Sequence, residues 1–332
     1  MSFARVAAGC LPPARTSEGP KMSSKPDNID TPQGLGFALA AYVFWGFLPL
    51  YLKMVSHIPP AEVVAHRVIW SVPIAGLLLI SLRRLGDLKT ALRTPRMLGM
   101  ACVTAAFISV NWGIYVWAVG SGRALEAALG YYINPLFSIA LGAILLGESL
   151  TRAQMVAVGL AAIAVIILTV AAGSLPFAAL GLTVSWGFYA FFKKSLPIGP
   201  NQGFLLEVLI LTLPALGYIA YLLLTGQSHF AATGSDTLLL LGCGAVTAVP
   251  LIVYANGAKL LKLSTIAILQ YIAPTMIFLV AVFVFKEPFG GARMVAFPLI
   301  WLALVIYSAS LLQEMRRKGR AKATAALPQH ET

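Results

Sequence analysis

Ten long apolar segments constrain this chain more than any other feature of its sequence. A helix needs about 20 apolar residues to cross the ~30 Å hydrocarbon core of a bilayer. The segments, each close to that length, cover residues 34–52, 62–82, 98–119, 124–146, 154–172, 175–192, 202–224, 237–258, 264–285 and 293–312. Only Gly173-Ser174 separates the fifth from the sixth, so we expect a tight hairpin there. The sequence therefore predicts an all-α membrane protein with ten transmembrane helices in a lipid bilayer.

Composition and the placement of charge agree with this class. Of 332 residues, 59% are hydrophobic and 11% are charged, against about 45–50% and about 25% in soluble domains. The net charge of +12 does not predict nucleic-acid binding, because the basic residues lie between apolar segments and in the tails. With both termini in the cytoplasm, 19 of the 24 Lys and Arg residues lie on the cytoplasmic side and four lie in outer loops. The remaining one, Arg67, lies within the second span, and the distribution follows the positive-inside rule.

Polar tails flank the apolar segments. Residues 1–33 are rich in Pro and Ser and predict a disordered cytoplasmic tail. No apolar stretch of ~7–15 residues precedes Cys10, so no signal peptide is expected, and Met22 is an alternative start. Residues 313–332 predict a short, basic, unstructured cytoplasmic tail.

The two halves of the chain resemble each other. A shift of 141 residues places Trp45-Gly46-Phe47 on Trp186-Gly187-Phe188. A shift of 139 residues places Tyr132-Ile133 on Tyr271-Ile272, Pro135 on Pro274 and Glu148 on Glu287. Five spans per copy is an odd number, so the second copy must enter the membrane upside down. We therefore predict two inverted five-helix repeats, residues 34–172 and 175–312.

Inverted repeats favour a transporter, because they provide two nearly equivalent packings around a site near the midplane. We predict a permease that moves a small organic solute by alternating access around a central aromatic cavity. We expect no enzyme activity, metal or other cofactor, and a homo-oligomer is one candidate assembly. No phosphate-loop pattern suggests an ATP-driven pump. One alternative is a membrane-embedded enzyme acting on a lipid or prenyl carrier, which would need clustered intramembrane carboxylates or histidines. Another is a non-transporting membrane partner protein, which the short loops disfavour.

Several motifs in order carry a resemblance to a known family. They are Tyr42-Val43-Phe44-Trp45-Gly46, Glu62 with His66-Arg67-Val68-Ile69-Trp70-Ser71, Asn111-Trp112, Leu129-Gly130-Tyr131-Tyr132-Ile133-Asn134-Pro135-Leu136, Gly147-Glu148, Gly173-Ser174-Leu175-Pro176 and Gln270-Tyr271-Ile272-Ala273-Pro274-Thr275. Over residues 34–312 the chain resembles the EamA-type permeases of the drug/metabolite transporter superfamily, of the RarD (chloramphenicol-sensitivity) kind. The resemblance implies a bacterial inner-membrane carrier without ATPase parts, usually an exporter of drugs or metabolites.

Polar aromatic and amide side chains near the middle of the predicted spans are candidates for the substrate lining. Such groups need a partner in an apolar surrounding and should therefore face the interior. They are Tyr42, Trp45, Asn111, Trp112, Tyr115, Tyr131, Tyr132, Asn134, Trp186, Tyr189, Tyr254, Asn256, Gln270 and Tyr271. For any one of them, hydrogen bonding between helices explains the residue equally well.

Prolines and charges within the spans are candidates for hinges and for gating or coupling residues. Pro135 and Pro274 occupy matching positions and are candidate hinges, although membrane helices also tolerate proline as a shaping residue. The candidates for gating or coupling are His66, Arg67, Glu126 and Glu207, with anchoring at span ends as the alternative. Glu62 or Glu126 is the expected partner of Arg67. Glu148 and Glu287 lie at span ends, where we expect helix capping or a turn.

Overall fold

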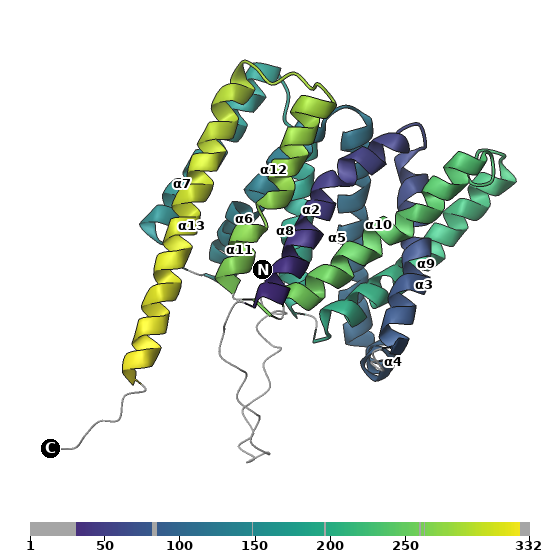
Figure 1. Cartoon of the computed structure of the whole chain (residues 1–332), viewed down its shortest axis with the longest axis horizontal. Coiled ribbons are helices and arrows are strands. Elements are labelled where there is room, and N and C mark those ends of the chain that lie inside the picture. Colours follow the sequence, from purple (N-terminus) through teal and green to yellow (C-terminus); the bar gives the residue numbers. More distant parts are fainter. Residues whose placement is uncertain are drawn as a thin grey trace, which may run out of the picture.

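In the computed structural model, the described part of the chain consists of helices and contains no strand (Figure 1). The description covers residues 31–325 without 82–84, 148, 196, 259 and 262. The elements are α2 (Pro32–Met54), α3 (Pro60–Ser81), α4 (Leu85–Arg93), α5 (Pro95–Gly120), α6 (Ala124–Leu146), α7 (Arg152–Ala172), α8 (Phe177–Ser195), α9 (Pro200–Leu224), α10 (Gly234–Ala258), α11 (Leu263–Leu269), α12 (Ile272–Leu279), the π-helix η1 (Val280–Val284) and α13 (Ala292–Ala325). The predicted all-α class is confirmed for these residues.

Eight helices in these ranges are long and apolar enough to cross a membrane: α2, α3, α5, α6, α7, α9, α10 and α13. Two predicted spans lie outside this set. The span 175–192 falls on α8, which ends on Lys193, Lys194 and Ser195, and the span 264–285 is divided into α11, α12 and η1. The chain is thus a multi-pass membrane protein, and the count of ten spans stays a prediction.

Large apolar side chains lie on the outer surface of the bundle. On α9, Leu224 is 88% and Leu213 is 80% exposed, and Ile144 on α6 and Val170 on α7 are similarly open. Water disfavours such a surface by about 25 cal/mol per Å² of apolar area, whereas lipid tails do not. Helices also satisfy their backbone N–H and C=O groups internally, as a bilayer requires. The exposed surface is therefore suited to lipid contact.

The local sequence explains where helices begin and end. Proline stands at the first helical position of α2, α3, α5 and α9, where its missing N–H has no partner to lose. Thr151 and Gln154 form a capping box at the start of α7. Gly147 and Gly173 end α6 and α7 at φ values of 67° and 64°, which glycine adopts without strain. With α8 beginning at Phe177, the helix break predicted at Gly173-Ser174 is confirmed.

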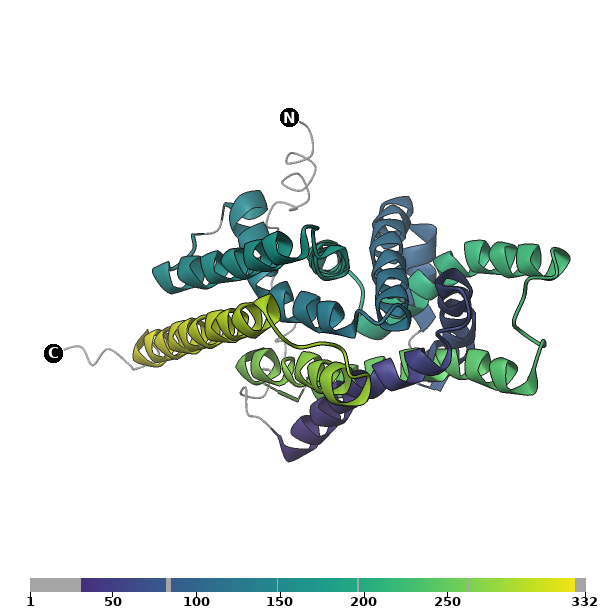
Figure 2. The ribbon, with the colours of Figure 1, turned by 90° about the horizontal axis from the view of Figure 1, so that it is seen from above.

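The helices form two groups at opposite ends of an elongated bundle. Helix α7 packs along α13 at one end, and α3 packs against α9 and α10 at the other (Figures 1 and 2). Between them, α2 contacts α10 and α12, α8 contacts α5 and α6, and α6 contacts α12. Figure 1 also shows that α2 begins and α13 ends on the same side of the bundle.

Two of these contacts use a glycine to bring helices close together. On α2, a Cβ added at Gly46 would lie 2.5 Å from Cβ of Met276 on α12. On α8, a Cβ added at Gly187 would overlap the ring of Phe137 on α6. In both places the absence of a side chain permits the observed helix separation.

The tails differ in part from expectation. Residues 1–30 of the predicted tail 1–33, with Cys10 and Met22, lie outside the described residues, as does Glu148. The unstructured tail expected from Gln313 is wrong as far as Ala325, because α13 continues to that residue. Alanine, arginine and lysine are strong helix formers, so the helix extends beyond the apolar segment.

We expect Gly244→Ala to destabilise the protein, because the new methyl group would overlap the backbone carbonyl of Trp70 where α10 crosses α3. Overpacking of this kind costs about 1–3 kcal/mol. Gly217→Ala on α9 is the control, since nothing lies within 4 Å of its Cβ position. Thermal unfolding in detergent should show a lower midpoint for Gly244→Ala alone. Equal midpoints for the two variants would contradict the close crossing.

Candidate functional site

A buried arginine lies where five helices meet. Arg67 on α3 is 4% exposed, its Nε donates to Thr247 Oγ1 on α10 at 3.0 Å, and its guanidinium lies 4.9 Å from the ring centroid of Trp112 on α5. Tyr115 on α5 and Tyr131 on α6 lie close enough to interact with it electrostatically, as do Tyr51 on α2 and Cys243 on α10. The fold therefore gathers three predicted lining residues around one predicted gate residue. We call this group, with Thr247, the Arg67 cluster.

The expected partners of Arg67 are engaged elsewhere. Glu62, fully buried on α3, accepts from the backbone N–H of His229 at 2.7 Å and lies 2.8 Å from Nδ1 of that residue. Glu126 lies 3.5 Å from Arg123. The prediction that either acid pairs with Arg67 is wrong, because the segment between α9 and α10 folds over the start of α3 and supplies the donors for Glu62. Among the described residues, no carboxylate forms an ion pair with Arg67.

A second aromatic group joins the N-terminal helix to α10. The rings of Tyr42, Trp45 and Tyr254 lie 5.5–5.6 Å apart, centroid to centroid. Tyr42 is buried and the other two are half-buried. Asn256, only two residues further along α10, is exposed instead, which corrects the expectation that it faces the interior. Two residues correspond to ~200° of helical rotation, so Asn256 points away from the aromatic group.

Other predicted lining residues connect helices to each other. Asn111 Nδ2 donates to Ser185 Oγ at 2.9 Å and to the carbonyl of Leu182 at 3.2 Å, which ties α5 to α8. The hydroxyl groups of Tyr132 and Thr275 lie 2.8 Å apart and link α6 to α12. For Asn111 and Tyr132, the structure favours the interhelical interpretation.

The matching prolines affect their helices differently. Pro135 lies within the continuous helix α6, beside buried Asn134, whose Oδ1 has no hydrogen-bond partner among the described residues. Pro274 lies in the first turn of α12, just after the turn Gln270-Tyr271 that separates α12 from α11. Gln270 and Tyr271 are half-buried at this break. The segment that holds Pro274 is therefore interrupted, whereas the segment that holds Pro135 is not.

Two titratable groups lie near the beginnings of α3 and α9. His66 accepts a hydrogen bond from Trp70 Nε1 at 3.0 Å through Nδ1 and stacks on Phe230 near the α9–α10 connection. Glu207, at the position in the second half that matches His66, lies 2.6 Å from Lys193 Nζ. Glu207 also accepts from the hydroxyl of Tyr189 at 3.2 Å, and the Tyr189 and Trp186 rings lie 5.5 Å apart. Both groups are thus buried and have partners.

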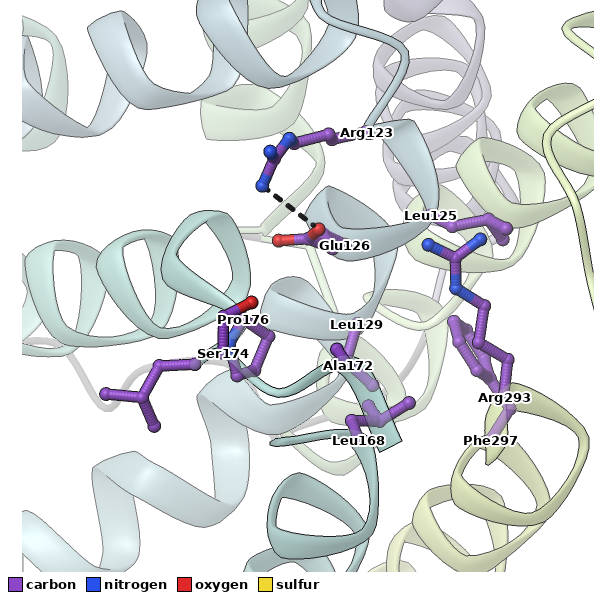
Figure 3. A pocket seen from close by; sticks show the side chains of 11 residues that line it. Arg123, Leu125, Glu126, Leu129, Leu168, Ala172, Ser174, Pro176, Arg293 and Phe297 are labelled. Atoms are coloured by element: carbon purple, nitrogen blue, oxygen red, sulfur yellow. Dashed lines mark ion pairs between the residues drawn. The ribbon is translucent and has the colours of Figure 1, made fainter. Parts of the chain in front are cut away.

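None of the predicted polar aromatic residues lines the cavity in Figure 3. It lies between α6, the α7–α8 turn and α13, and Arg123, Glu126 and Arg293 line it. Figure 3 shows Arg123 pointing toward Glu126, with Arg293 reaching in from α13. Its volume of about 70 Å³ is well below the ~300 Å³ of the smaller ligand pockets. We therefore do not assign the substrate to it.

Glu287 closes this end of the bundle. Its two carboxylate oxygens accept from the backbone N–H groups of Ala124 and Leu125 at 2.7 and 2.9 Å, which caps α6. Burial raises the pKa of the Glu287 carboxyl above its usual range, and the two N–H donors oppose that shift. The expected capping role is confirmed, on a helix of the other repeat.

Sequence reasoning missed residues that complete these groups. Thr247 and Cys243 reach the Arg67 cluster from α10, far away in sequence, and Tyr51 reaches it from the preceding helix α2. His229 reaches Glu62 from a loop. Thr247 carried a weak signal, because a hydroxyl within an apolar span needs a partner. Its pairing with α3 has no signature in the sequence.

Comparisons with known proteins agree with this architecture. The sequence profile of the EamA-like transporter family matches residues 32–170. The chain is 44% identical over 296 residues to Protein RarD of Streptomyces exfoliatus, which covers 89% of this chain and 94% of that protein. It is 40% identical over 295 residues to the uncharacterized transporter YojE of Bacillus subtilis (strain 168), covering 87% and 98%. A crystal structure of a protein 21% identical in sequence matches with a TM-score of 0.56, over 86% of this chain and 97% of that chain, and so shares the fold.

We expect Glu287→Ala to destabilise the protein by about 1–3 kcal/mol, the usual effect of leaving buried N–H groups without an acceptor. Glu287→Gln is the matched variant, since its amide oxygen can still accept from Ala124 or Leu125. It should cost less, because burial disfavours the charged form. Thermal unfolding midpoints in detergent should fall in the order wild type, Gln, Ala. A midpoint for Glu287→Ala equal to that of the wild type would refute the capping role.

Proposed function

This chain belongs to the EamA-type permeases of the RarD family, and on that premise we propose that it is a secondary transporter of a small organic solute. Relatives along nearly the whole chain include one named as a transporter, although its solute is not part of that name. The proposed location is the bacterial inner membrane. Both termini would lie in the cytoplasm, as the excess of Lys and Arg on that side favours.

The observation that carries the proposal is a pair of helix contacts at repeat-related positions. Gly46 contacts Met276, and Gly187 contacts Phe137. A shift of 141 converts Gly46 into Gly187, and a shift of 139 converts Phe137 into Met276. The same glycine-mediated contact thus joins α2 to α12 and α8 to α6. This supports two structurally equivalent halves.

The packing of whole helices follows the same rule. Helix α2 packs on α10 and α12, and α8, its counterpart, packs on α5 and α6, the counterparts of α10 and α12. The contacts α3–α9, α6–α12 and α7–α13 each join a helix to its own counterpart. This pattern supports an inverted repeat with a pseudo-twofold axis, in which the sixth and ninth predicted segments also span the membrane.

We propose that the halves rock around this axis to give alternating access. The break before Pro274 and the matching Pro135 are the proposed hinges, because a proline leaves one helical carbonyl without its donor. The aromatic group Tyr42, Trp45 and Tyr254 forms part of the proposed lining. His66, Glu126 and Glu207 are the proposed gates, and each lies near the beginning of its helix, α3, α6 or α9.

Transport in proteoliposomes tests the proposal. A panel of labelled amino acids, aromatic carboxylates and chloramphenicol-like drugs would be measured with and without a proton gradient. Saturable flux of at least one solute is expected, and Trp45→Ala should reduce it about tenfold or more if the ring stacks on the solute. Phe47→Ala is the matched control, since Phe47 lies on the same helix and is half exposed. No flux from correctly inserted protein would contradict the transporter function. Equal flux from both variants would contradict the proposed lining.

A further inference from the structure

Arg67 is the exception among the deeply buried charges of the described chain. Glu62 has His229, Glu207 has Lys193, and Glu287 has two backbone N–H groups. Arg67 has only the neutral hydroxyl of Thr247 and the ring face of Trp112. A buried charge without an opposite charge is strongly disfavoured, so this cluster lacks an anion.

Two polar atoms of the cluster also lack hydrogen bonds. Nη1 of Arg67 and the hydroxyl of Tyr115 are both buried without a partner among the described residues. Tyr115 is 3% exposed, and its ring lies 5.4 Å from that of Tyr131 in a T-shaped contact. Buried N–H and O–H groups are normally paired. Both atoms are donors, and both therefore suit the same kind of acceptor.

The guanidinium is held in one orientation. Its Nε is fixed by Thr247 and one face is covered by Trp112, while Nη1 is a buried donor without a hydrogen-bond partner among the described residues. A planar guanidinium donates two parallel N–H groups to a carboxylate. The aromatic side chains Trp112 and Tyr131 around it suit an apolar or aromatic body.

We propose that the Arg67 cluster binds the carboxylate of the transported solute, with Arg67 and Tyr115 as donors and Thr247 as a positioning residue. The inference rests on the proposed transporter function and narrows it to organic carboxylates with an apolar or aromatic body. The second half offers no equivalent charge, because the shift of 141 residues places buried Val208 at the position of Arg67. One carboxylate site per chain follows.

Ligand binding to the full-length protein in detergent tests the site separately from flux. The probes are benzoate, 3-phenylpropionate and hexanoate, each compared with its neutral amide. At least one carboxylate should raise the thermal unfolding midpoint while its amide does not. Arg67→Gln should weaken binding about tenfold or more, the loss expected for a charge-assisted hydrogen bond. Arg123→Gln, which removes an exposed arginine at the cavity of Figure 3, should leave binding unchanged.

Tyr115→Phe serves as a second variant, because it removes only a hydroxyl that has no hydrogen-bond partner among the described residues. It should keep the unfolding midpoint of the free protein and weaken carboxylate binding several-fold. The proposal is overturned if no carboxylate binds, if amides or sodium chloride stabilise equally well, or if both variants bind like the wild type. Carboxylate binding without flux of any solute would instead refute the transporter and retain the site. Flux of neutral solutes without carboxylate binding would refute the carboxylate site and retain the transporter.

Discussion

Inside a bilayer no water is available to complete a hydrogen bond, and the rest of this structure depends on that constraint. It requires the backbone of every crossing segment to be helical. It also explains why polar side chains on different helices meet in pairs, such as Tyr132 with Thr275 and Asn111 with Ser185. Hydrophobic burial contributes little to helix association in lipid, because lipid tails are as apolar as leucine. Close packing at glycines and these polar pairs therefore decide which helices become neighbours.

The same constraint bears on the contacts between the first and second halves of the chain. Glu287, from the second half, caps a helix of the first, and α3, α6 and α7 each contact their own counterparts. Such contacts hold the halves together across a shared surface while each half keeps its internal packing. The two halves of the chain differ at several of the positions that the sequence shifts align. Helix α6 is continuous at Pro135, whereas the matching segment breaks before Pro274, and the position of His66 is occupied by Glu207.

Much of the fold could be predicted from one sequence, because apolar length, proline and glycine act locally. Residues 154–172 and 175–192 were separable at Gly173 for that reason. Partners across the bundle could not be predicted. Glu62 is five residues from Arg67, a spacing that does not place two side chains on one helix face, and its actual partner comes from a loop more than 160 residues away. Asn256 shows a related failure, since a polar residue within an apolar segment need not face inward.

The tail after Gln313 was misjudged because charge ends an apolar segment without ending a helix. Within the candidate site, the residue types were recognisable and their grouping was not. Trp112, Tyr115 and Tyr131 could be selected as polar aromatic residues, but only the crossing of α3, α5, α6 and α10 brings them to Arg67.

The placement of one arginine against a valine has a geometric consequence. A cavity with twofold symmetry could hold a solute in either of two reversed poses. Because Val208 stands where symmetry would require a second guanidinium, an anionic head group bound as proposed would have one anchoring point whichever side of the membrane the proposed carrier faces. The solute would then travel without turning over, leading with its charged end in one direction and trailing it in the other. The charged end of the solute would lose its water first in one direction and last in the other. The two directions of transport would therefore differ, even in a carrier whose two proposed halves are alike.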